Sequence, residues 1–207
     1  MNNKGNMGIS AIPVLISFLI AGATTSSVIL KSSDTTSGDV GQIVNDALEK
    51  ITTYLEINDA IGKYDVTDGV RSVEKIVLLV KPLVSTNINM SEVMIKISND
   101  NDVLLLSYSG YAVERSSAET IFENKIWDKT DNAFGLIVLI DTDNSLLTYS
   151  VMNDDTAFIA IKLPSGFAMT NDESLTISII PAQGTTTSVV IETPSFHTAN
   201  IISFTEI

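Results

Sequence analysis

Cysteine is absent from the 207-residue chain, which excludes disulfide bonds, thiolate metal sites and anchoring through a lipidated cysteine. Histidine occurs once, as His197, so any Ser-His-Asp triad would have to use this residue. The sequence contains no G-x-S-x-G turn that would offer a nucleophile. His197 follows Pro194 in a predicted loop, where it is expected to be an exposed or capping residue. An enzyme is therefore the least favoured class of protein.

Positive charge is also scarce. The chain has 12 lysines and arginines against 25 aspartates and glutamates, a net charge of −13. From residue 57 to the C-terminus, 9 basic and 20 acidic residues leave a net charge of about −11. Binding of nucleic acid requires lysine and arginine to neutralise phosphates, so we expect no nucleic acid partner. An acidic surface of this kind keeps a protein soluble through self-repulsion.

Charge is missing altogether between Lys4 and Lys31. Residues 8–30 read GISAIPVLISFLIAGATTSSVIL and are mostly apolar. As an α-helix, residues 9–30 would be about 33 Å long, which matches the hydrocarbon core of a bilayer. Small residues within the stretch would let such helices approach one another closely. We therefore expect a helix that lies in a membrane first and packs against copies of itself later.

Two kinds of processing fit this N-terminus. An ordinary secretory signal peptide would use Lys4 as its basic region, residues 9–20 as its apolar region and residues 21–23 as a small-x-small cleavage site. Alternatively, cleavage after Gly5 would retain the apolar helix in a mature protein that begins at Asn6. Composition alone leaves both open.

The letters KGNMGI at residues 4–9, followed by an uninterrupted apolar run, resemble the start of archaeal flagellin (archaellin) precursors of the type IV pilin-like superfamily. In that family a short basic leader ends in glycine, and a prepilin-peptidase-like enzyme cuts after it. The resemblance implies cleavage between Gly5 and Asn6. Archaeal adhesion pilins share this leader chemistry, and two features depart from the archaellin pattern: Pro13 and the single basic residue of the leader. A divergent archaellin, a minor filament subunit and a pilin are all consistent with the sequence.

The resemblance also implies an extracellular filament, the archaeal flagellum or archaellum. Its subunits form a homopolymer, or a co-polymer with related subunits, that serves swimming motility and adhesion. Pro13 removes a helical hydrogen bond, so we predict that the helix is kinked there or begins there. The residues expected to form the polymerisation helix are Gly8, Ile9, Ile12, Leu15, Ile16, Leu19, Ile20, Ile29 and Leu30.

Helical periodicity returns after a polar stretch with two glycines at residues 31–41. Apolar residues recur at spacings of three and four over residues 40–55, which predicts an amphipathic helix. A helix continuous from residue 8 to 56 would be about 70 Å long, too long for a globular chain of this size unless neighbouring subunits cover it. The predicted organisation is a cleaved leader (1–5), a long helix in the filament core (6–56) and an outer β domain (57–207).

Period-two alternation and β-branched residues follow residue 57. Turn signals separate the short strands, which predicts an antiparallel, immunoglobulin-like β-sandwich. The fold class is therefore α+β, a long N-terminal hydrophobic α-helix followed by this sandwich, with residues 109–132 as a long connection or partial helix. The expected strands are 73–80, 93–98, 103–108, 134–141, 146–152, 157–163, 174–180, 187–191 and 201–205.

Asp141, Asp143 and Asn144 resemble the opening of an oxygen-ligand calcium loop. The glycine at the sixth position and the glutamate at the twelfth are missing. Asp154 and Asp155 would join the group if the predicted hairpin folds back. A structural metal ion such as calcium is one interpretation, and a plain turn is the other.

Asn89 begins the only N-x-S/T sequence, in a stretch between expected strands. Archaellins are typically N-glycosylated, so the resemblance implies modification here, and an unused turn is the alternative. A different class of protein is also open: a secreted or anchored β-sandwich binding module, such as an adhesin. That class requires cleavage after Ala23 or permanent anchoring, and it leaves the helix at residues 40–55 without a partner.

Overall fold

The structure is a computed structural model that describes residues 53–67, 69–84, 87–115, 121–196 and 198–204. All of these residues fall within one compact unit, Glu49–Ile207. The leader, the hydrophobic helix and the amphipathic helix up to residue 52 lie outside the described residues. None of the helices in the described ranges is long and apolar enough to cross a membrane.

The described part of the chain is mostly β-structure, with short helical segments between strands. The strands are β1 (Leu55–Thr67), β2 (Val70–Pro82), β3 (Ile88–Asn89), β4 (Met94–Ser98), β5 (Val103–Glu114), β6 (Ala133–Ile140), β7 (Val151–Met152), β8 (Thr156–Lys162), β9 (Ser174–Ile180), β10 (Thr187–Glu192) and β11 (Ile201–Ser203). The helical segments are η1 (Met90–Glu92), η2 (Ile121–Glu123), η3 (Lys125–Lys129) and α2 (Ser145–Tyr149).

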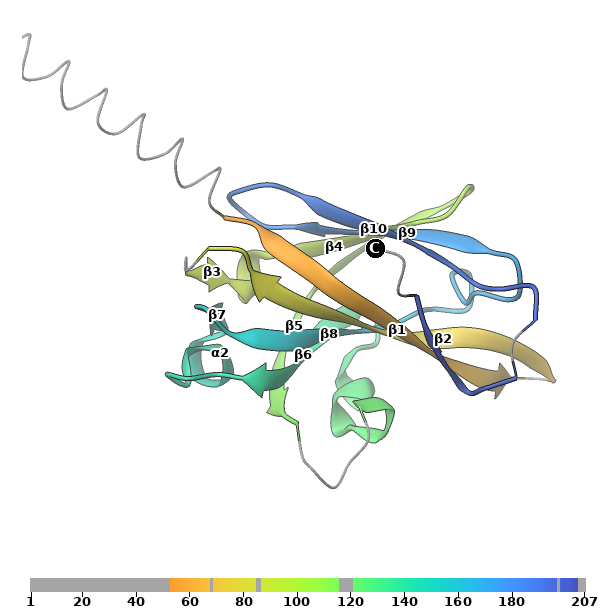
Figure 1. The fold of residues 1–207 in the computed structure, drawn as a ribbon, viewed down its shortest axis with the longest axis horizontal. Helices are drawn as coiled ribbons and strands as arrows, with labels where there is room; N and C mark the ends of the chain where they lie inside the picture. The colour runs from red at the N-terminus through yellow and green to blue at the C-terminus, as the bar shows by residue number, and fades with distance from the viewer. Residues whose placement is uncertain (1–52, 68, 85–86, 116–120, 197, 205–207) are drawn as a thin grey trace, which may run out of the picture. The chain divides into compact units, whose positions relative to one another are not determined.

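Nine strands form one sheet in the order β10-β9-β4-β5-β6-β8-β2-β1-β11, while β3 and β7 pair separately. The sheet curls so that β10 returns to lie beside β1 (Figure 1). Thr185 N donates to Thr53 O at 3.0 Å, and Thr187 Oγ1 donates to Leu55 O at 2.7 Å. These bonds hold strands from opposite ends of the sheet together around a shared hydrophobic core.

The β-rich character expected after residue 57 is confirmed, but the antiparallel immunoglobulin-like sandwich is not the observed arrangement. One continuous curled sheet replaces two separate sheets, and β5 and β6 pair in parallel. Parallel neighbours require a crossover rather than a tight turn, and the chain between Glu114 and Ala133 supplies it through η2 and η3.

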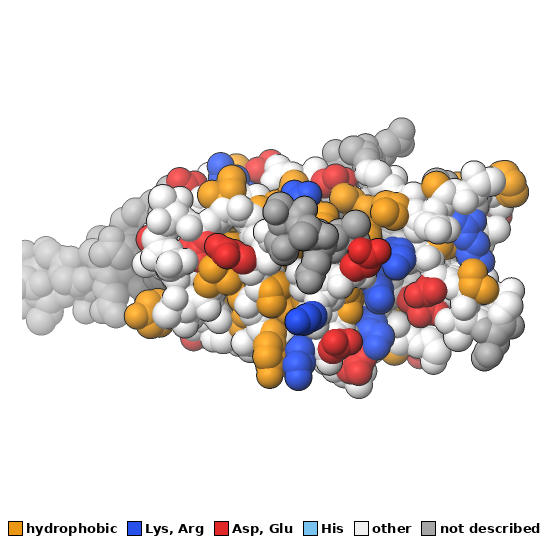
Figure 2. Space-filling model, turned by 90° about the horizontal axis from the view of Figure 1, so that it is seen from below, with side chains coloured by type: hydrophobic (Ala, Val, Ile, Leu, Met, Phe, Trp, Pro, Cys, Tyr) orange, Lys and Arg blue, Asp and Glu red, His pale blue; other side chains and the backbone are white. Residues whose placement is uncertain are grey.

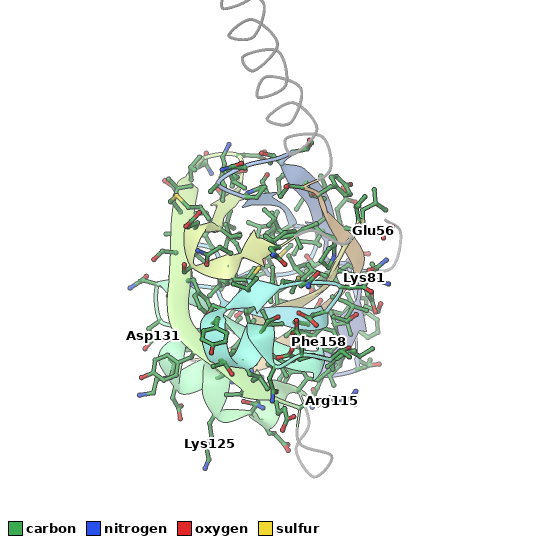
Figure 3. The ribbon with its side chains drawn as sticks, turned by 90° about the vertical axis from the view of Figure 1, so that its left-hand side faces the viewer. Glu56, Lys81, Arg115, Lys125, Asp131 and Phe158 are labelled. Atoms are coloured by element: carbon green, nitrogen blue, oxygen red, sulfur yellow. The ribbon has the colours of Figure 1, made fainter. Side chains whose placement is uncertain are left out.

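The central strands β6, β8 and β2 are buried on both faces. In β2, Ile76, Leu78 and Val80 face the main core, whereas Val77 faces the opposite side. The segment with η2 and η3 covers that side, which faces the viewer in Figure 2. Figure 3 shows Phe158 of β8 beside this cover and Lys125 projecting away from the sheet. The second cluster contains Val77, Phe122, Ile126, Trp127, Ile137, Phe158 and Ala160.

Residues 109–132 were expected as a long connection or partial helix, and they contain the end of β5 and the short helical segments η2 and η3. β5 continues to Glu114, and the following segment inserts apolar side chains against the sheet. Trp127 is buried, its Nε1 donates to Ile121 O at 3.0 Å, and its ring stacks on Phe122 with centroids 5.9 Å apart. Burial of a tryptophan with its N–H satisfied is a favourable use of this side chain.

Two further expectations were wrong in detail. Residues 146–152 were expected as a strand but form α2 and the short β7. Asn144 and Ser150 adopt left-handed conformations at its two ends, which close a single helical turn over the buried Leu146. The helix expected up to residue 55 is also wrong at its end, because β1 begins at Leu55. The bulges in the β1–β2 pairing disturb the alternation that would have revealed β1.

A substitution at Gly184 tests this account of the curled sheet. Gly184 has φ +107° and lies beside Thr53. A Cβ at this position would lie 2.0 Å from Thr53 O, so Gly184→Ala must shift the backbone that joins the two ends of the sheet. We expect a loss of at least about 1–3 kcal/mol from backbone strain alone, measured by thermal or denaturant unfolding. Gly166→Ala is the matched control, because its Cβ would meet nothing within 4 Å. Equal stability of the two variants would contradict this account of the curl.

Candidate functional site

Three aspartates from two parts of the chain meet at one end of the central strands. Asp141 and Asp143 follow β6, and Asp155 immediately precedes β8. β6 and β8 are antiparallel neighbours with Ile140 opposite Thr156, so the end of one strand and the start of the other coincide. One carboxylate oxygen from each aspartate lies within 4.8 Å of the others.

Backbone N–H groups fix the orientation of all three carboxylates. Each aspartate accepts a backbone hydrogen bond from the loop that contains α2 and β7, so the loop is folded around the cluster. The bonds are Leu147 N to Asp141 Oδ2 at 3.0 Å, Ser145 N to Asp143 Oδ1 at 2.9 Å and Asn153 N to Asp155 Oδ2 at 2.8 Å.

The second oxygens of two of these carboxylates are buried without a hydrogen-bond partner among the described residues. They are Asp141 Oδ1 and Asp155 Oδ1, and Asp155 is 0% exposed. A buried carboxylate oxygen without a partner is costly, because the group loses its hydration and gains nothing in return. Hard oxygen donors that converge in this way suit a cation such as Ca²⁺.

The pKa values of two aspartates in the cluster are shifted in opposite directions. Burial raises the pKa of Asp155; the Asn153 N–H opposes this shift, and the negative charges of Asp141 and Asp143 add to it. The pKa of Asp143 is instead lowered, mainly by hydrogen bonds from the Ser145 side chain and backbone. The arrangement therefore resists full ionisation unless positive charge is supplied.

The structure brings together only part of the expected metal site. Asp141 and Asp143 belong to the carboxylate cluster, and Asp155 joins them because β8 pairs with β6, whereas residues 146–152 form no hairpin strand against β6. Asn144 adopts φ 61°, and its side chain makes no capping hydrogen bond to α2. Asp154 is exposed, and its Oδ1 lies 4.0 Å from Lys81 Nζ. In the sequence, the feature that could identify Asp155 as a site residue is its position just before an apolar strand.

Asn89 lies at the junction of β3 and η1 and is half-buried. Its Oδ1 accepts from Ser91 N at 3.1 Å and from Ser91 Oγ at 2.6 Å, while its Nδ2 donates to Glu92 Oε1 at 2.9 Å. The side chain thus caps a turn, and attachment of a glycan to Nδ2 would leave one N–H that can still donate to Glu92. Glycosylation of Asn89 stays a prediction.

The remaining expected site residues lie outside the described residues. They are the cleavage pair Gly5 and Asn6, the polymerisation helix residues Gly8, Ile9, Ile12, Leu15, Ile16, Leu19, Ile20, Ile29 and Leu30, and His197.

Comparison with known proteins identifies the class to which this fold belongs. Residues 5–191 match the family model of archaeal-type flagellin, so the chain belongs to the archaeal-type flagellin family. Flagellin B3 of Methanocaldococcus jannaschii is 24% identical over 211 residues, which cover 98% of this chain and 96% of that protein.

Two solved structures share the fold. The crystal structure of archaeal flagellin FlaB1 from Methanocaldococcus jannaschii has a TM-score of 0.62 at 21% identity, covering 72% of this chain and 94% of that one. The archaeal flagellum of Methanospirillum hungatei strain JF1 gives 0.63 at 16% identity, covering 94% and 98%. At these identities the similarity establishes the fold of the chain.

The raised pKa of Asp155 predicts how stability depends on pH without metal. An aspartate with a raised pKa binds more protons in the folded state than in the unfolded state, so the free energy of unfolding falls as pH rises from about 4 through the folded pKa. Asp143 titrates below that window, because its pKa is lowered. In EDTA, Asp155→Asn should abolish the fall in this window.

Urea unfolding at a series of pH values measures this slope. The matched control is Asp102→Asn, an exposed aspartate in the turn between β4 and β5, which should keep the wild-type slope. A wild-type slope in Asp155→Asn would show that Asp155 does not carry the effect.

Proposed function

We infer that this chain is a structural subunit of the archaeal flagellar filament, which is the propeller for swimming. The observation that carries this conclusion is the family match, which spans residues 5–191 and therefore includes both the apolar N-terminal stretch and the β domain. The fold shared with a flagellin crystal structure and with an archaeal flagellum supports it. Membership in this family supports a structural role rather than catalysis.

The apolar stretch provides the proposed mechanism of assembly. A prepilin-peptidase-like enzyme cuts the membrane-held precursor after Gly5, and the helix that begins at Asn6 then moves from lipid into a bundle of identical or related helices. The family match includes this stretch, since it spans residues 5–191. The proposed parts are the leader 1–5, the core helix 6–56 and the outer domain 57–207.

Close packing stabilises such a bundle, because both lipid and bundle are apolar surroundings. Dissociation of the bundle into water, in contrast, would expose apolar side chains. About ten large apolar side chains at roughly 1.5–3 kcal/mol each would become exposed, a gross cost on the order of 15–30 kcal/mol before association terms. A helical polymer built in this way is hard to dissociate. Pro13, near the start of the mature helix, marks a kink or the first full turn.

A charge placed in the proposed bundle tests the filament mechanism. Ile16→Lys puts an ammonium group among apolar helices, where it is costly, so filaments that sediment from sheared cells should fall at least tenfold. Leu105→Lys is the matched control, because Leu105 is 55% exposed on β5. The control should leave filament yield unchanged. Normal filament yield from Ile16→Lys would contradict the assembly mechanism.

We also propose that Asp141, Asp143 and Asp155 hold a structural cation such as Ca²⁺. The support is the convergence of their oxygens and the two buried oxygens without partners. The ion would neutralise the like charges and hold the loop of α2 and β7 to the ends of β6 and β8. It has no catalytic part in this proposal.

Calcium should therefore stabilise the EDTA-treated protein. A ligand at one hundred times its dissociation constant adds about 2.7 kcal/mol, so the melting temperature should rise with calcium concentration. Asp155→Asn should remove this dependence, and Asp102→Asn should retain it, as measured by calorimetry. An unchanged wild-type melting temperature in millimolar calcium, or an equal rise in Asp155→Asn, would refute the site.

A further inference from the structure

Three lysines lie directly opposite one another on adjacent strands. Lys63 of β1 pairs with Lys75 of β2, and Lys75 pairs with Lys162 of β8. Lys75 alternates with Val77 on the face covered by η2 and η3, so the row lies on that outer face. Neighbouring strands are about 4.8 Å apart, and like charges directly opposite are destabilising. We call these residues the lysine row.

Little within the described chain neutralises the lysine row. Lys162 Nζ lies 2.6 Å from Asp131 Oδ1, an exposed ion pair. Lys75 Nζ lies 5.4 Å from the centroid of the Trp127 ring. The Lys63 side chain forms no hydrogen bond or ion pair with the described residues. Figure 2 shows lysine and arginine side chains on this face, with aspartate and glutamate side chains among them. In a chain of net charge −13, such a concentration of positive charge requires an explanation.

A patch of the opposite sign lies at one end of the sheet. The end of β4 and the start of β9 pair through Ser98 and Thr176, and the end of β10 pairs with Ser174, so the adjoining turns come together. Five carboxylates gather there, and none forms an ion pair with a described residue. They are Asp100, Asp102, Asp172, Glu173 and Glu192, which we call the acidic end.

The acidic end is hollowed rather than convex. Asp100, Asp172 and Glu173 line a depression of about 240 Å³. Glu173 is held in place there, because its Oε2 accepts from Thr170 N at 2.6 Å. The depression thus presents carboxylates from two separate turns to an incoming cation.

We propose that the lysine row of one subunit docks against the acidic end of a second copy of this chain in the filament. The argument rests on charge complementarity and on the proposed function, which places many copies side by side. A contact that joins opposite charges offsets the mutual repulsion of two strongly acidic copies. The two patches are different surfaces, so the contact is heterologous and repeats along an open helix. Complementary charge of this kind fixes register more than affinity.

Carbodiimide cross-linking of native filaments tests the contact, because this reagent joins an amine directly to a carboxylate that touches it. Contacts between copies appear as dimers and larger species on denaturing gels. Mass spectrometry should find Lys63, Lys75 or Lys162 joined to peptides that contain the acidic end. Raising the salt concentration should lower the yield, since exposed charges are screened.

Variants make the test specific. Lys63→Gln combined with Lys75→Gln should lower the dimer yield at least threefold, and Lys63→Gln alone should lower it without touching Trp127. The matched control is Lys96→Gln, an outward-facing lysine of β4 that forms no ion pair with the described residues and should leave the yield unchanged.

Failure of this contact is distinguishable from failure of the proposed function. Absence of sedimenting filaments in the wild type would overturn the proposed function itself. Normal filaments whose cross-links are unaffected by the row variants would overturn only the contact. Cross-links from the row to another surface of the copy, or to a different protein, would also overturn it.

Discussion

Burial of the central strands on both faces is the constraint on which the rest of this domain depends. β6, β8 and β2 carry apolar side chains in both directions, so each face requires a cover. The curled sheet supplies one cover by closing on itself, and the segment with η2 and η3 supplies the other. Gly135 shows how close the second cover lies, since a Cβ there would be 2.6 Å from Ile126 Cδ1.

The central strands also position the aspartate cluster and the lysine row. The cluster of Asp141, Asp143 and Asp155 forms where β6 ends and β8 begins, so two rigid strands hold its members in place. The lysine row lies on the same outer face as the cover, beside Trp127. A filament subunit needs such a rigid outer domain, because each contact must repeat identically in every copy.

Local sequence patterns predicted the strands whose own residues show an apolar run or a regular alternation. The apolar run FGLIVLI of β6 and the clean alternation of β9 and β10 were visible in this way. β1 was missed because bulges and polar residues such as Asp59 and Lys63 break its period. The parallel pairing of β5 and β6 depends on a distant crossover, which no local pattern encodes.

The candidate sites also divide into residues that a local sequence pattern reveals and residues that only strand pairing brings together. Asp141 and Asp143 stand two residues apart, so the pattern of a cation loop drew attention to them. The burial of Asp155 and its unpartnered oxygen depend on how β8 pairs with β6, which the sequence does not display. The lysine row was not predicted at all, because its members come from three strands and meet only through register.

Retention of the apolar N-terminal helix is the central claim of this account, and the amino terminus of protein isolated from native filaments tests it most directly. Amino-terminal sequencing or mass spectrometry of the terminal peptide measures it. The account predicts a mature chain that starts at Asn6 and keeps the helix for the filament core. A chain that starts at Thr24 would contradict it, because ordinary secretion would then have removed the segment on which assembly depends.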